Sequence, residues 1–406
     1  MGIDDLVRKL VGGTILEVMV DDDTTTTGSA GALGVEQLRR IGLDAGLAAV
    51  GVTSAEPLEP ARSVLPLRRS KGLAATMQFT YRNPDRSTDP TRLLRAARSL
   101  VVGILDYHRL EPGTEPSSRP AGRIARYSWR DFYRRLDDGL RAMADALEVA
   151  GHRAVVVADS NALVDRNAAW RAGLGWYGKN TNLLVPGGGS WYVIGSVVTD
   201  AVLEPSGRPV ADGCGTCTTC LDDCPTGALV APGVLDARRC IAWLVEAAEP
   251  IPVEYREAVG DWMYGCDICQ EVCPPNRVTL RRRNPPPLEA DGRASVDLRW
   301  VLEASDAELL AAYGRWYIAD RDPDLLRRTA LVVLGNVGDA TDPVAGELVE
   351  RYLHHTNPRL RAHAVWTARR LGLDDLAEHT RRDPDPDVRD EWAHDVEPVT
   401  AGTDRS

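Results

Sequence analysis

All eight cysteines of this 406-residue chain fall between residues 214 and 273. The first run reads Cys214-Gly-Thr-Cys217-Thr-Thr-Cys220-Leu-Asp-Asp-Cys224-Pro225. The second comprises Cys240 and, further on, Cys266-Asp-Ile-Cys269-Gln-Glu-Val-Cys273-Pro274. Cysteines spaced in this way before a final Cys-Pro are typical of bacterial ferredoxins, in which three close thiolates hold one 4Fe-4S cluster and the fourth ligates the next. The pattern predicts a ferredoxin-like double 4Fe-4S domain.

The second run has one close ligand fewer than the first, and Cys240 can supply the missing thiolate. With the fourth cysteines exchanged between the runs, the first cluster takes Cys214, Cys217, Cys220 and Cys273. The second cluster then takes Cys224, Cys240, Cys266 and Cys269. The eight cysteines thus make two complete clusters.

Structural zinc and disulfides are the rival interpretations of these cysteines. Zinc ribbons pair two knuckles, whereas Cys214 to Cys224 places four cysteines in one short run that ends in proline and is followed by a second run. Disulfide frameworks belong to short secreted domains, and the start of this chain has no signal-peptide pattern. We therefore expect reduced thiols and a cytoplasmic protein.

The composition, 44% hydrophobic and 26% charged residues, is ordinary for a globular chain of two or three domains. No stretch approaches the roughly 18 consecutive apolar residues of a membrane span, so we expect no membrane association. The net charge of −11 argues against a generally basic nucleic-acid binder but leaves room for a local basic face.

The order of sequence patterns predicts a multidomain α+β chain. Residues 1–34, which include the polar run Asp21–Ser29, are expected to be a flexible extension. Residues 35–209 mix candidate strands at 99–105, 153–158 and 191–198 with a helix over 131–150 that Gly151 ends. Residues 210–290 carry the cysteines and end at the Pro-rich segment 281–287.

The remaining sequence, residues 291–396, is expected to be helical. Three segments, beginning Asp322-Pro-Asp, Asn357-Pro-Arg and Asp385-Pro-Asp, each place a capping side chain and a proline before an apolar helix. This weak internal repeat resembles HEAT repeats, whose stacked helices form extended binding surfaces. Residues 397–406 are expected to be a disordered tail.

The segment from Asp159 to Trp191 is the densest in candidate functional residues. Asp159 follows a predicted buried strand, where a carboxylate can exchange a proton in an enclosed site. Its simpler role is to cap the next helix. The glycines that follow would let backbone approach a bulky ligand. No Gly-x-Gly-x-x-Gly follows a strand, which argues against a nicotinamide or flavin Rossmann site.

Taken together, these motifs resemble the epoxyqueuosine reductase family of cobalamin-dependent iron-sulfur enzymes, which act on tRNA. The resemblance covers nearly the whole chain after residue 34. It is carried by the segments Arg86-Ser-Thr-Asp-Pro90, Arg126-Tyr-Ser-Trp129, Asp159 to Thr181, both cysteine runs, and Arg328-Thr-Ala-Leu-Val-Val-Leu-Gly-Asn336.

The resemblance implies that residues 35–209 form an α/β domain that binds base-off cobalamin, which the two clusters reduce. It implies that Asp159 protonates the substrate, the epoxyqueuosine of a tRNA anticodon loop. It also implies a monomer that receives electrons from an external donor such as ferredoxin or flavodoxin. The implied cobalamin contacts are Arg86, Ala125 through its backbone, Asp159, Leu183, Ile194 and Asp267.

Departures from the family pattern leave a different substrate open. The stretch Trp129 to Tyr133 is one residue shorter than is usual and lacks a histidine, and Asn167 replaces a small residue. The alternatives are a related cobalamin iron-sulfur reductase acting on a small molecule, as reductive dehalogenases do, and an electron carrier or assembly factor without its own substrate.

A tRNA substrate requires basic side chains that contact its backbone. Two sets of arginines are candidates, and for each the alternative is an ordinary ion-paired surface. One set lies beside the second cluster, at Arg277, Arg281, Arg282 and Arg283; the other lies on the repeats, at Arg327, Arg328, Arg359 and Arg361.

Overall fold

The computed structural model describes residues 33–112 and 120–399. The expected extension therefore lies outside the described residues except for Leu33 and Gly34, and Gly34 caps the first described helix, α2 (Val35–Asp44). The predicted tail lies outside them from residue 400 onward. Before that point, the backbone N–H of Val399 donates to the carbonyl of Arg370 at 2.8 Å, so this part of the tail is bound to the helical region.

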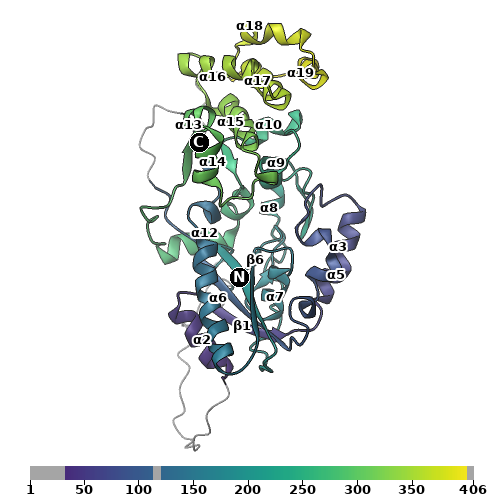
Figure 1. Ribbon diagram of the computed structural model, residues 1–406, viewed down its shortest axis with the longest axis vertical. Coiled ribbons are helices and arrows are strands. Elements are labelled where there is room, and N and C mark those ends of the chain that lie inside the picture. Colours follow the sequence, from purple (N-terminus) through teal and green to yellow (C-terminus); the bar gives the residue numbers. More distant parts are fainter. Residues whose placement is uncertain (1–32, 113–119, 400–406) are drawn as a thin grey trace, which may run out of the picture. The chain divides into compact units, whose positions relative to one another are not determined.

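An antiparallel sheet of four strands forms the middle layer of residues 35–209 (Figure 1). Its order is β1 (Ala49–Ser54), β2 (Ser99–Asp106), β7 (Tyr192–Thr199) and β4 (Ala154–Ala158). Three of these strands confirm the predicted ones, and β1 was not foreseen. The two central strands, β2 and β7, are almost wholly buried, as their runs of β-branched residues indicate.

Helices cover both faces of this sheet (Figure 1). On one face, α6 (Phe132–Val149) packs beside α2; on the other lie α7 (Asp165–Arg171) and α3 (Glu59–Ser70). The helix α6 confirms its prediction: Asp131 accepts the N–H of Arg134 at 3.0 Å as an N-cap, and Gly151 ends the turn with φ +89°. Its apolar face, Leu136, Leu140, Met143 and Leu147, has no exposed surface.

Short elements connect these layers. After α3, the helical segments before β2 are α4 (Phe79–Arg82), α5 (Pro84–Ser87) and η1 (Pro90–Arg92), and η2 (Arg126–Ser128) precedes α6. The hairpin β5–β6 (Trp176–Tyr177 and Leu183–Leu184) lies within the glycine-rich segment. At Gly175 a Cβ would come within 2.4 Å of the Leu184 carbonyl oxygen, so the missing side chain here admits the protein's own backbone.

The cysteine-bearing segment consists of short elements. They are α8 (Thr219–Asp222), the hairpin β8–β9 (Leu229–Ala231 and Val234–Leu235), α9 (Ile241–Glu246), α10 (Val253–Val259), β10 (Trp262–Tyr264), α11 (Ile268–Glu271) and α12 (Pro274–Arg283). The strand β10 pairs in parallel with β3 (Ala121–Ile124), whose other edge pairs with β11 (Ser295–Asp297). This second sheet takes one strand from each of the three predicted domains, so the three domains are interleaved.

The C-terminal region is helical, as predicted. Its elements are α13 (Leu298–Glu303), α14 (Asp306–Tyr313), η3 (Ala319–Arg321), α15 (Asp324–Val337), α16 (Pro343–Leu353), α17 (Pro358–Arg370), α18 (Asp374–Ala377), η4 (Glu378–Arg382), α19 (Pro386–Asp390) and η5 (Glu391–Ala393). The predicted caps are present: Asn357 and Asp385 accept N–H groups of α17 and α19, and each helix begins with proline. At α15, Asp322 accepts the N–H of Asp324.

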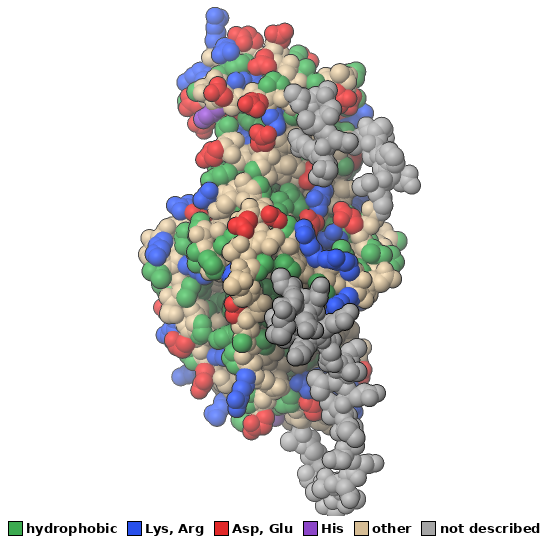
Figure 2. Space-filling view, turned by 180° about the vertical axis from the view of Figure 1, so that it is seen from behind, with side chains coloured by type: hydrophobic (Ala, Val, Ile, Leu, Met, Phe, Trp, Pro, Cys, Tyr) green, Lys and Arg blue, Asp and Glu red, His purple; other side chains and the backbone are tan. Residues whose placement is uncertain are grey.

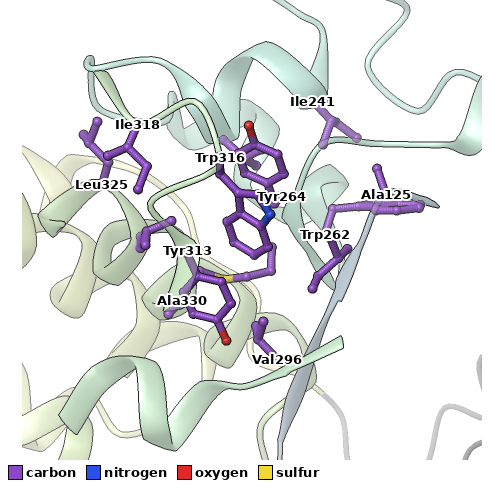
Figure 3. Packing of buried hydrophobic residues seen from close by; sticks show 14 of the residues in the cluster. Ala125, Ile241, Trp262, Tyr264, Val296, Tyr313, Trp316, Ile318, Leu325 and Ala330 are labelled. Atoms are coloured by element: carbon purple, nitrogen blue, oxygen red, sulfur yellow. The ribbon is translucent and has the colours of Figure 1, made fainter. Parts of the chain in front are cut away.

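Aromatic rings join the helical region to the second sheet. The ring of Trp316 stacks between those of Tyr264, at 4.3 Å, and Tyr313, at 4.4 Å, and Figure 3 shows these rings together with Trp262 and Ile318. Since Tyr264 belongs to β10, this packing ties the segment before η3 to the cysteine-bearing region. Among the described residues, no helix has the length and apolar character needed to cross a membrane.

A buried ion pair joins α10 to the C-terminal end of the helical region. Arg256 donates to both carboxylate oxygens of Glu391 at 2.7 Å, and the two side chains are only 2% and 8% exposed. The Glu391→Ala substitution should therefore lower the free energy of unfolding in urea by about 3–5 kcal/mol, because it leaves the guanidinium buried without its partner. The matched control is Glu378→Ala, whose partner Arg381 is exposed and which should cost less than about 1 kcal/mol. Equal losses in the two variants would contradict this role.

Candidate functional site

A cavity of about 480 Å³ lies where the sheet domain meets the cysteine-bearing segment. Its wall takes residues from the end of β4, the segment 180–194, α9, α11 and the segment 315–317. These stretches are far apart in the sequence, so only the folded chain creates the cavity. A mostly apolar concave site with a few polar groups is the usual form of a ligand or active site.

Asp159 stands at the edge of this cavity, directly after β4. Its backbone is left-handed, with φ +45°. It does not cap a helix, because α7 begins six residues later at Asp165. Partial desolvation raises the pKa of the Asp159 carboxyl, and the nearby Arg166 guanidinium opposes that rise. A carboxyl in this setting is suited to proton transfer.

The cysteines are expected to form two groups of four, with one ligand exchanged between the runs, and this assignment stays a prediction. Burial is the largest of the effects that raise the pKa of the Cys273 thiol to about 12, and the thiolates of Cys214, Cys220 and Cys217 contribute to the rise. Burial likewise raises the pKa of Cys269, and Cys240, Cys220 and Cys224 add to that rise. All eight cysteines are free of disulfides. Within the described residues, no three His, Cys, Asp or Glu side chains are arranged to hold a single metal ion.

Only one of these groups borders the cavity. Its wall includes the four cysteines Cys224, Cys240, Cys266 and Cys269. The other four, which also belong to the described residues, are not part of the wall. The cavity therefore places Asp159 and one complete cysteine group around the same space.

Side chains of the segment 179–182 hold the cysteine loops against the sheet domain. Lys179 donates through Nζ to the carbonyls of Gly215 at 2.6 Å and Cys217 at 2.8 Å. Asn180 donates to the carbonyl of Cys269 at 3.1 Å. Lys179 thus fixes the first cysteine run.

The predicted cobalamin contacts divide into two sets. Leu183, Ile194 and Asp267 border the cavity together with Asp159. Arg86 is exposed and outside the wall. Ala125 is buried outside the wall as well; its N–H donates to Tyr264 and its carbonyl accepts from Ser128, each at 2.9 Å.

Asp267 carries an unused acceptor at the cavity. One carboxyl oxygen accepts the N–H of Arg126 at 2.7 Å, whereas Oδ1 is buried without a hydrogen-bond partner among the described residues. Burial raises the pKa of Asp267 to about 7. Buried polar atoms are nearly always paired, so Oδ1 is a candidate contact for a bound group.

Three residues of the cavity wall were not predicted from the sequence: Tyr127, Tyr133 and Glu246. Tyr127 donates through its hydroxyl to Oε1 of Glu246 at 3.1 Å. Burial raises the pKa of Tyr133, from the shortened stretch, well above its usual value, and the charge of Asp159 raises it further. Glu246 had a recognisable signal, since it is the first charged residue after the apolar run Ile241–Val245 that follows Cys240.

The arginines of the helical repeats are bound within the protein. Arg328 has no exposed surface and donates to carbonyls at the end of α9. Arg327, Arg359 and Arg361 form ion pairs with Asp324, Asp322 and Asp383. The interpretation as an RNA contact is therefore wrong for Arg328, which is buried, and stays a prediction for the three ion-paired arginines.

The arginines of α12, near the cavity, have different surroundings from the arginines of the repeats. In the part of the chain that the structure describes, Arg277, Arg281 and Arg282 are exposed and make no ion pair with a carboxylate. Arg283 donates to the hydroxyl of Tyr192, which lines the cavity, at 3.2 Å. The basic end of α12 thus adjoins the cavity rim. Figure 2 shows basic side chains gathered at mid-height on one face, with acidic ones beside them.

Comparison with known families gives two matches. Residues 213–276 match the model of the 4Fe-4S double cluster binding domain. Residues 87–165 match the model described as epoxyqueuosine reductase QueG, DUF1730. The first match covers all eight cysteines, and the second reaches the segment that contains Asp159.

Curated relatives and solved structures extend these matches to most of the chain. Epoxyqueuosine reductase of Bacillus anthracis is 30% identical over 86% of this chain and 92% of its own length. That of Xanthomonas campestris is 33% identical over 83% of this chain and 96% of its own length. A crystal structure of epoxyqueuosine reductase with an epoxyqueuosine-modified tRNA-Tyr stem loop has a TM-score of 0.78 at 28% identity, covering 88% of this chain and 96% of that one.

The fold, the eight-cysteine domain and this identity over nearly the full length of its relatives agree, and the chain belongs to the epoxyqueuosine reductase family.

Proposed function

We propose that this protein reduces epoxyqueuosine to queuosine in the anticodon loop of tRNA, with electrons delivered through two 4Fe-4S clusters. The observation that carries the proposal is the shared cavity, which has one complete cysteine group and Asp159 in its wall. Family membership supports this substrate over a small molecule. A pure electron carrier would need neither the cavity nor a carboxyl placed in it.

Electrons enter the cavity through the cluster that borders it. The group Cys214, Cys217, Cys220 and Cys273 holds the outer cluster, and the group Cys224, Cys240, Cys266 and Cys269 holds the inner one. Mutual effects among the thiolates within each group support this division. An external one-electron donor, of the ferredoxin or flavodoxin kind, reduces the outer cluster.

Cobalamin is the cofactor that the family resemblance implies, and the cavity fits it in part. Leu183 and Ile194 would give apolar contact, and the unpartnered Oδ1 of Asp267 would accept a hydrogen bond. Bound there, the cofactor would supply a strongly reducing cobalt centre. The chain's own residues exclude water, orient the substrate and, at Asp159, deliver a proton.

The RNA enters over the basic end of α12. Because Arg283 bonds to Tyr192 of the wall, a backbone held by the α12 arginines lies next to the cavity mouth. The target base must leave its stack to reach the interior, as in other enzymes that modify bases.

The remaining features belong to the same proposal. Residues 35–209 form the catalytic domain, 210–290 the double-cluster domain and 291–396 HEAT-like repeats that support it. The protein works as a monomer in the cytoplasm, where its tRNA substrate resides.

The exchange of cluster ligands can be tested by iron content in double variants. Cys214→Ala with Cys273→Ala removes two ligands of one cluster, so about four of the eight irons should remain. Cys214→Ala with Cys224→Ala removes one ligand from each cluster, so both should be lost. The opposite result would mean that Cys224 belongs with Cys214 and that the ligands are not exchanged.

Asp159→Asn tests the proton donor. The variant should keep about eight irons and bind the tRNA stem loop, while its rate of epoxyqueuosine conversion falls about 100-fold or more, because a carboxamide does not deliver a proton. The exposed Asp44→Asn on α2 is the control and should leave the rate unchanged. Wild-type turnover by Asp159→Asn would remove this residue from the mechanism.

Charge reversal of Arg281, Arg282 and Arg283 tests the RNA surface. The triple glutamate variant should bind the stem loop more weakly, and its affinity should depend less on salt, by about one unit of slope for each lost phosphate contact. Reversal of the exposed Arg62, Arg92 and Arg141 makes the same change in net charge. Equal effects of the two triple variants in a salt titration would contradict a specific role for α12.

A further inference from the structure

Removal of an epoxide oxygen has a fixed stoichiometry. Both C–O bonds break, a carbon–carbon π bond forms, and the oxygen leaves as water after taking up two electrons and two protons. The electrons come from the external one-electron donor through the clusters. Asp159 holds one carboxyl and so delivers one proton before it must be reloaded. The proposed function therefore requires a second source of protons at the cavity.

Glu246 is a carboxyl of the cavity wall that has no role in the steps above. It is the last residue of α9, partly buried, with part of its surface on the cavity. The hydroxyl of Tyr127 donates to its Oε1 at 3.1 Å. With Tyr127 as donor to one oxygen, the proton of a neutral Glu246 carboxyl can be directed to an acceptor in the cavity.

The end of α9 is held firmly in place. The buried guanidinium of Arg328 donates to the carbonyls of Leu244 at 3.1 Å, Val245 at 2.8 Å and Ala247 at 2.6 Å, which lie on both sides of Glu246 in the sequence. A cation at the C-terminal end of a helix also satisfies carbonyls that have no partner within the helix. Glu246 therefore has a fixed position, as a proton donor requires.

The surroundings of Glu246 favour its protonated form. Burial, partly opposed by the Tyr127 hydrogen bond and aided by the charge of Asp159, raises the pKa of Glu246 to about 8. The other titratable groups that interact with it are Tyr264 of β10, Tyr317 before η3 and Cys240 at the start of α9. A thiolate-ligated cluster is anionic, so cluster binding acts in the same direction.

We propose that Glu246 supplies the second proton of the reduction, with Asp159 supplying the first and Tyr127 orienting the Glu246 carboxyl. The inference rests on the proposed function, because it assigns a role within that reaction. Glu246 then regains its proton from solvent between turnovers.

Glu246→Gln tests this role, because glutamine keeps the volume and the acceptor for Tyr127 but has no proton to release. We expect kcat to fall about 100-fold at unchanged affinity for the stem loop. In wild type the acid must be protonated, so the rate should decline as pH rises through about 8, and the variant should lack this decline. Glu246→Asp should restore part of the rate, and the exposed Glu254→Gln on α10 should match wild type. An unchanged rate and pH profile in Glu246→Gln would overturn the proposal.

A second measurement needs no substrate. Infrared difference spectra of the cluster-loaded protein across pH 8 should show the loss of a protonated carboxyl band that Glu246→Gln lacks. A spectrum in which the variant keeps this band would overturn the proposal even if the enzyme is active. If wild type leaves the epoxide intact, the proposed function fails, and the infrared band still reports separately on Glu246.

Discussion

The proposed exchange of one cysteine ligand between the two runs is the constraint that ties the cysteine-bearing segment to the cavity. Burial raises the pKa values of the Cys269 and Cys273 thiols, neighbouring thiolates raise them further, and a cluster that binds four thiolates would relieve this repulsion. An exchange of Cys224 and Cys273 requires the two runs to fold against one another. That folding brings Cys224, Cys240, Cys266 and Cys269 to the wall of a cavity whose opposite residues come from the sheet domain.

The two carboxyl groups of the cavity wall, Asp159 and Glu246, have different electrostatic surroundings. Asp159 is accessible from the cavity and has an arginine nearby, whereas Glu246 lies deeper and bonds to a tyrosine. The same burial that raises the pKa of Glu246 suits it to the proposed role of proton donor at neutral pH. The helical region contributes at a distance: Arg328 on α15 holds the end of α9, and Trp316 packs on Tyr264.

The sequence predicts those parts that depend on local patterns. The apolar period of α6, the β-branched runs of β2 and β7 and the asparagine or aspartate caps of α17 and α19 each have a local physical cause, and all are present. The strand β1 was missed because Ala49-Val-Gly-Val-Thr-Ser54 carries glycine and small polar residues, and its pairing with β2 determines its structure. The interleaved second sheet was missed because strands of three or four residues exist only through long-range pairing.

The features of the site that could be predicted are likewise those that are local in the sequence. Cysteine spacing is local, and the position of Asp159 after a strand is local as well. In contrast, Glu246 meets Tyr127 across more than a hundred residues, and the repeat arginines find their carboxylates through helix packing. The decisive measurement for the reduction of epoxyqueuosine is mass spectrometry of a tRNA stem loop that contains this nucleoside. The stem loop is first incubated anaerobically with the cluster-loaded, cobalamin-supplemented protein and a reductant. The proposed reaction yields an RNA product that has lost one oxygen atom. Unchanged RNA from protein that holds both clusters and cobalamin would contradict it.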